Sequence, residues 1–143
     1  MKILDTMEIG HSALRAQTTR LNTISSNLAN METTQTPEGG PYQKKSVVFE
    51  SVENEFQGHL DKSMRGAGGG VRVREIISDQ NGGKMVYEPS HPDADDEGYV
   101  EKPDISLVEQ MTDMMSAKGS YKANVEAIKS AQDMAKSALE IGR

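Results

Sequence analysis

The sequence contains no cysteine, which excludes disulfide bonds, thiolate metal sites and thiol nucleophiles. It also contains no tryptophan, and only 4% of its residues are aromatic and 35% hydrophobic. A chain of 143 residues with so little bulky apolar material cannot build a thick globular core. We therefore expect the buried surface to be spread along a thin structure.

Two further absences concern membranes and nucleic acids. There is no apolar run of about 18 residues and no charged-then-apolar leader before a small-residue cleavage site, so neither a membrane span nor a cleavable signal is predicted. The net charge of −6 disfavours nucleic-acid binding, which needs clustered Lys and Arg. The excess acid lies in residues 31–103, with eight basic and fourteen acidic side chains, while both ends of the chain are nearly neutral. Near-neutral amphipathic ends suit packing against other helices, and an acidic middle suits solvent.

The longest pattern that is present covers the last forty residues, Asp104 to Arg143. Alternating steps of four and three residues follow a row in which only Lys118 and Gln132 are polar. The row consists of Leu107, Met111, Met114, Lys118, Tyr121, Val125, Ile128, Gln132, Ala135 and Leu139. This 3.5-residue period predicts a long helix with a coiled-coil seam.

The start of this helix is marked by two signals. Pro103 bars extension toward the N-terminus, and Ser106 with Glu109 has the spacing of a capping box. Gly142 supplies a stop signal at the other end.

A second heptad pattern covers Ile3 to Ala29, which contains no proline. Its main row consists of Met7, Leu14, Leu21 and Leu28. Ile24 belongs to the intervening row, which Gly10 and Gln17 weaken. We expect this segment to form a helix that pairs with the C-terminal helix as a coiled coil.

The middle of the chain is predicted to contain a small antiparallel β-rich domain. Tyr42 to Val52 and Val71 to Arg74 alternate as strands do, and Asn81-Gly82-Gly83 predicts a hairpin between Glu75–Ile77 and Met85–Tyr87. Residues 53–66 have no clean period and carry no predicted element. The predicted fold is therefore α+β, with residues 1–30 and 104–143 forming a helical inner domain and residues 31–103 a β-rich outer domain.

Each candidate chemical site in this middle segment lacks a feature that its chemistry requires. Residues 93–104 approximate the spacing of a calcium loop, but prolines occupy the incoming side and Asp104 replaces the bidentate Glu. His91 beside Ser90 does not define an acid/base pair, because neighbours in sequence usually point in different directions. Phosphate-binding loops follow a strand and precede a helix, whereas the glycine-rich run here precedes the predicted strand at Val71. The sequence therefore predicts no catalytic residue, no cofactor and no metal.

Several motifs resemble those of bacterial flagellar proteins. Asn-Leu-Ala-Asn at 27–30 is similar to the N-terminal signature of the rod, hook and hook-associated proteins. Further motifs, in the order of one proximal rod protein family of the basal body, are Gly40-Pro41-Tyr42, Val47-Val48-Phe49, Gly70-Val71-Arg72-Val73, Tyr87-Glu88-Pro89, His91-Pro92-Asp93-Ala94, Gly98-Tyr99-Val100 and Ser120-Tyr121-Lys122-Ala123-Asn124-Val125-Glu126. Together they span nearly the whole chain.

The resemblance implies a structural subunit of the proximal rod, and not an enzyme. It implies export through the flagellar type III apparatus without a cleavable signal peptide, and a place in the periplasmic part of the basal body. The terminal helices would surround the export channel and the shaft would transmit torque. Implied partners are further copies of the chain, other rod proteins, the basal-body ring and adaptor proteins and the export apparatus, with no nucleic acid and no direct membrane insertion. The alternative is a long-helical adaptor or export chaperone, which the strand-rich middle disfavours.

The residues expected to form the helix-packing and subunit interface follow from the two rows and the motifs. They are Met7, Leu14, Leu21, Ile24, Asn27, Leu28, Asn30, Leu107, Met111, Met114, Tyr121, Asn124, Val125, Ile128 and Leu139. Because an isolated seam loses the burial that offsets chain ordering, we also expect the terminal helices to fray in the free subunit.

Overall fold

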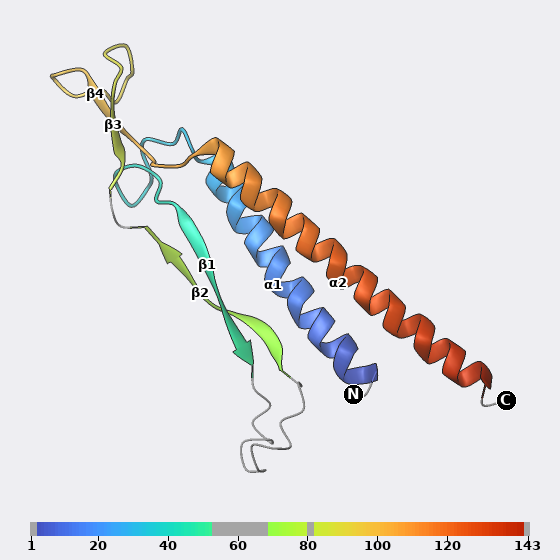
Figure 1. Ribbon diagram of the computed structural model, residues 1–143. Helices are drawn as coiled ribbons and strands as arrows, with labels where there is room; N and C mark the ends of the chain where they lie inside the picture. The colour runs from blue at the N-terminus through green and yellow to red at the C-terminus, as the bar shows by residue number, and fades with distance from the viewer. Residues whose placement is uncertain (1–2, 53–68, 80–81, 142–143) are drawn as a thin grey trace.

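The computed structural model describes residues 3–52, 69–79 and 82–141 (Figure 1). Its elements are, in chain order, α1 (Ile3–Ala29), β1 (Lys45–Val52), β2 (Gly70–Ser78), β3 (Lys84–Tyr87), β4 (Tyr99–Lys102) and α2 (Leu107–Ile141). The predicted α+β class is confirmed. Residues 53–66, for which the sequence predicts no element, all lie outside the described part of the chain.

The two helices lie side by side and run in opposite directions. In Figure 1, α1 lies between the β1–β2 ribbon and α2, and it contacts both. α2 is eight residues longer than α1, with 35 residues against 27, and it extends beyond the start of α1 (Figure 1). At 1.5 Å per residue, the two helices are about 40 and 52 Å long.

The start of α2 forms half of the predicted capping box. The Ser106 hydroxyl accepts a hydrogen bond from the Glu109 amide at 3.4 Å, as expected of an N-cap serine. The carboxylate of Glu109 instead accepts a hydrogen bond from Lys44 Nζ at 3.0 Å. This side chain therefore links α2 to the segment before β1.

The strands form two separate two-stranded antiparallel sheets. β1 pairs with β2 from Lys45↔Ser78 to Val52↔Gly70, and β3 pairs with β4. The predicted hairpin between Glu75–Ile77 and Met85–Tyr87 is wrong, because β1 is the partner of β2 and β4 is the partner of β3. Gly82 nevertheless has a φ of +75°, in the left-handed region that favours glycine.

The core is thin, as the composition predicts. The buried apolar side chains among the described residues are Ala16, Ile24, Val100, Ala117, Ile128 and Ala131. Half of these are alanines, which bury little surface. The accessible surface of 10678 Å² is well above the ~7,200 Å² expected of a compact monomer of this mass. The fold therefore leaves an unusually large surface for contacts with other molecules.

Candidate assembly interface

The two helices meet through small and polar side chains. Gln110, Ala117 and Ala131 are each at most 1% exposed, and Asn124 between them is half-buried. These four residues are seven apart and form one row on α2. On α1, Gly10 is buried at the same contact.

Gly10 determines how closely the helices approach. A Cβ atom at this position would lie 2.6 Å from Cγ1 of Ile128, closer than real Cβ contacts. The backbone of α1 therefore lies against the side chain of Ile128, which is 8% exposed. A glycine that lowers helix propensity is needed here for packing.

At the other end of the contact, Asn27 connects three elements. Its Nδ2 donates to the Lys45 carbonyl at 2.8 Å and to Gln110 Oε1 at 3.1 Å. Its Oδ1 accepts from the Lys45 amide at 2.9 Å and from the Tyr42 hydroxyl at 3.2 Å. All four hydrogen-bonding positions of a buried amide are thus used. Asn27 holds the end of α1, the start of β1 and the first turn of α2 together.

Two ion pairs reinforce this junction. Arg20 lies 3.3 Å from Asp113, and Lys44 lies 3.0 Å from Glu109. Because all four side chains are partly exposed, each pair is worth at most about 1 kcal/mol. Their main effect is to orient the first turns of α2.

The residues predicted for the interface differ in burial. Ile24, Asn27 and Ile128 are buried. Those that are half-buried are Met7, Leu14, Leu21, Leu28, Asn30, Met114 and Asn124. Those that are exposed are Leu107, Met111, Tyr121, Val125 and Leu139, with exposed fractions from 37% to 76%.

These five residues of the predicted row are thus exposed in the single chain, and a coiled-coil pairing along the whole row is not confirmed. The small row Gln110–Ala131 lets the backbones come close, and this turns the bulkier neighbouring row toward the flank of the pair. The signal for the small row was its seven-residue spacing. A pattern of large apolar residues does not include this row, because its members are small or polar.

An exposed apolar surface on α2 results from this rotation. Val108 and Met115 are each 73% exposed, beside Leu107 and Met111 of the predicted row. Leu139, near the C-terminal end of α2, is 76% exposed. Contiguous exposed apolar side chains of this kind mark surfaces that contact other proteins.

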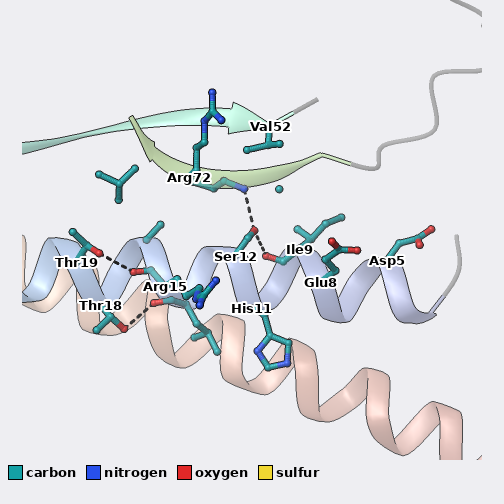
Figure 2. A pocket seen from close by; sticks show the side chains of 15 residues that line it. Asp5, Glu8, Ile9, His11, Ser12, Arg15, Thr18, Thr19, Val52 and Arg72 are labelled. Carbon is teal, nitrogen blue, oxygen red and sulfur yellow. Dashed lines mark hydrogen bonds between the residues drawn. The ribbon is translucent and has the colours of Figure 1, made fainter. Parts of the chain in front are cut away.

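An open groove of about 940 Å³ lies between α1 and the β1–β2 ribbon (Figure 2). Ser12 spans it at one point, donating to the Ile9 carbonyl at 2.7 Å and accepting from the Val71 amide at 3.0 Å. Apolar side chains of both elements line the groove, and Asp5, Glu8 and Arg15 stand at its edge on α1.

The acidic stretch before β4 makes turn contacts. Asp95 Oδ1 accepts from the amides of Glu97 and Tyr99, and His91 Nδ1 accepts from the Asp93 amide. In the described ranges, no group of three or more His, Cys, Asp or Glu residues is placed to hold a metal ion. Neither described helix has an apolar stretch long enough to cross a membrane.

Lys102 of β4 lies between two carboxylates. Its Nζ is 2.8 Å from Glu88 and 3.2 Å from Glu32. The hydrogen bond from Lys102 lowers the pKa of Glu88, and the bonds to Glu88 and Glu32 raise the pKa of Lys102. This cluster attaches the β3–β4 hairpin to the loop that follows α1.

Two segments of the chain match families of flagellar rod proteins. Residues 7–35 match the family model described as "Flagella basal body rod protein", and residues 96–141 match "Flagellar basal body rod FlgEFG protein C-terminal". The chain is 40% identical to the flagellar basal-body rod protein FlgC of Bacillus subtilis strain 168, over all of both chains. It is equally similar, again over all of both chains, to FlgC of Escherichia coli O157:H7. FlgC of Borreliella burgdorferi is also 40% identical, over 99% of this chain and 98% of the relative.

Proposed function

The chain belongs to the FlgC family of flagellar basal-body rod proteins, and from this premise we propose that it is a proximal-rod subunit whose terminal helices assemble into a tubular shaft. As a family member it is a structural protein of the flagellar basal body, it serves motility, and it is not an enzyme. It assembles with other rod components.

The observation that carries the proposal is the exposed row on α2. Met111 and Val125 are 52% and 38% exposed although their heptad spacing is that of a packed seam. Met7, Leu14 and Leu21 of α1 are only half-covered. An amphipathic row that its own chain leaves open is covered when helices of neighbouring subunits lie along it.

A shaft built in this way transmits torque through packing. Helices of about 40 and 52 Å that interlock along their length resist bending, because many dispersion contacts must slip together. We place residues 1–30 and 104–143 in the inner wall around an export channel, and residues 31–103, with their excess acid, on the outside.

The remaining parts of the proposal concern location and partners. The subunit reaches the periplasmic rod through the flagellar type III apparatus without a cleavable signal peptide. It then contacts further copies of itself, other rod proteins and the ring and adaptor proteins. An adaptor or export chaperone is the alternative, and the rod-protein relatives favour the rod subunit over it.

Fractionation of basal bodies from the native bacterium tests the proposal. The wild-type chain should co-purify with basal bodies. The variant Met111→Asp/Val125→Asp should be lost from them, and motility with it, because buried carboxylates lack partners. Ser116→Asp/Ser130→Asp is the matched control, since both serines are exposed on α2 outside the row.

Helicity of each purified variant, measured by circular dichroism, separates misfolding from failed assembly. Absence of the wild-type chain from basal bodies would refute the rod assignment. Normal incorporation of the Met111→Asp/Val125→Asp variant would refute the role of the exposed row.

A further inference from the structure

Sulfur in this chain is confined to methionine. The sequence contains nine methionines and no cysteine, so no thiol competes with the thioethers for an oxidant. Four methionines among the described residues are more than half exposed, namely Met85, Met111, Met115 and Met134. In the free subunit these side chains are therefore accessible to small oxidants.

Two of the four lie together on the exposed apolar surface of α2. Met111 is 52% exposed and Met115 is 73% exposed. They are four residues apart on the helix, which puts them on one face, and Val108 lies on that face seven residues before Met115. Assembly through the exposed row of α2, as proposed above, covers Met111 and its neighbour Met115.

A peroxide converts a methionine thioether to a sulfoxide in one reaction. The sulfur takes an oxygen atom from the peroxide, so that an S–O bond forms, the O–O bond breaks, and water leaves when the oxidant is hydrogen peroxide. The sulfur is oxidised by two electrons and the peroxide is reduced by two. The product is a polar group in place of an apolar one, and it loses free energy wherever it is buried without a hydrogen-bond donor.

The free and assembled subunits respond differently to this change. Met111 and Met115 lie about 120° and 160° round α2 from the buried Ala117, so their sulfoxides stay in water in the free subunit. In an assembly that covers this face, the same groups are enclosed by the apolar side chains of a neighbour. The cost of oxidation therefore falls on assembly and not on the fold of the chain.

We propose that Met111 and Met115 form a peroxide-sensitive modification site that controls assembly. Oxidation of these two thioethers in the free subunit prevents the chain from entering the basal body. This inference rests on the proposed function, since it names the regulation of the surface through which the subunits pack.

The chain supplies its own matched control in Met134. This residue is 60% exposed on the same helix, but it lies about 140° round α2 from Met111. It shares the face of Ser116, which is exposed outside the apolar row. Its oxidation should therefore leave assembly unchanged.

Mass spectrometry of the wild-type chain tests the site without any substitution. In the native bacterium, synthesis of the chain is induced after hydrogen peroxide has been added, at a dose that oxidises about four-fifths of Met115 in the soluble pool. Sulfoxide at Met111 and Met115 should be at least about fivefold rarer in purified basal bodies than in the soluble pool. Sulfoxide at Met134 should be equally frequent in the two fractions.

The amount of incorporated chain separates exclusion of oxidised subunits from shielding after assembly. At this dose, incorporation of the wild-type chain should fall about fivefold, because only the unoxidised fraction assembles. Met111→Leu/Met115→Leu keeps a similar apolar volume and cannot form a sulfoxide, so its incorporation should not change. Met134→Leu should lose incorporation as the wild-type chain does.

Three results would overturn the inference. They are unchanged incorporation of the wild-type chain at this dose, an equal loss of the Met111→Leu/Met115→Leu variant, and sulfoxide at the two residues that is equally frequent in both fractions. The first and third need no variant, so they decide the question even if the leucine variant does not incorporate without peroxide. Presence of the wild-type chain in basal bodies without peroxide leaves the proposed function standing in each case, and its absence would overturn both.

Discussion

Asn27 Nδ2 donates a hydrogen bond to Gln110 Oε1 across 3.1 Å, although 83 positions separate the two residues in the chain. Both side chains are 1% exposed. Asn27 begins the Asn-Leu-Ala-Asn motif that resembles the flagellar axial signature. In this fold the motif asparagine joins the end of α1 to the start of α2, with β1 bound to the same amide.

Asn27→Ala should destabilise the helix pair. The substitution leaves the Lys45 amide and Gln110 Oε1 without partners in a buried place, at a cost of about 1–3 kcal/mol in the free energy of unfolding. The loss is measured as a lower midpoint in thermal melts followed by circular dichroism. Asn22→Ala is the control, because Asn22 is exposed on the same helix and should change the midpoint little. Equal effects of the two substitutions would contradict the role of the junction.

Gly10→Ala should destabilise the protein although alanine favours helix by about 1 kcal/mol. The added Cβ would lie 2.6 Å from Ile128 Cγ1, and overpacking of this kind costs about 1–3 kcal/mol. Gly119→Ala is the matched control, since a Cβ there meets nothing within 4 Å and should only add helix propensity. In the same melting experiment, Gly10→Ala is therefore expected to lower the midpoint and Gly119→Ala to raise it. In the combination Gly10→Ala/Ile128→Ala the added Cβ no longer meets the long side chain of Ile128. The loss of stability should therefore be smaller than the sum of the two single losses, which shows that the two sites are coupled.

Lys102 should control the titration of Glu88. In the folded protein, the hydrogen bond from Lys102 lowers the pKa of Glu88 below its ordinary 4.5, and that of Lys102 is raised above 10.5. The stabilisation by this pair is therefore complete between pH 4.5 and 10.5; it is lost as the pH falls through the lowered pKa of Glu88 or rises through the raised pKa of Lys102. In Lys102→Met, the pKa of Glu88 should move up toward its ordinary value, measured by NMR titration of the carboxyl carbon. Lys84→Met at the opposite strand position should leave it in place.

Hydrogen exchange in the free subunit should be graded along the helix pair. The centre of the pair contains Ala117, Ala131 and Gly10, which bury little surface, so residues 1–30 and 104–143 should exchange quickly. Amides next to the Asn27–Gln110 junction should be the slowest of these, and assembly should protect both helices. Uniform protection of both helices in the free subunit, equal to that of β1–β2, would contradict this prediction.

The sequence determined the helices, the thinness of the core and the family. Heptad spacing without proline defined α1 as Ile3–Ala29, because local periodicity and breakers suffice to place a long helix. Pro103 and Ser106 likewise located the start of α2 close to Leu107. The short motifs identified the family because they occur in the right order along nearly the whole chain.

Only the tertiary structure decided which faces meet. Heptad counting selects the bulkiest row, but Gly10 permits an approach so close that Gln110, Ala117 and Ala131 fill the contact with Ile128, while Met111, Val125 and other large members of that row stay exposed. Strand pairing was decided in the same way, since β1 pairs with β2 although residues 53–69 separate them in the chain, whereas a local turn signal favours a neighbouring partner. Both outcomes depend on distances between residues far apart in the chain, which local patterns do not contain.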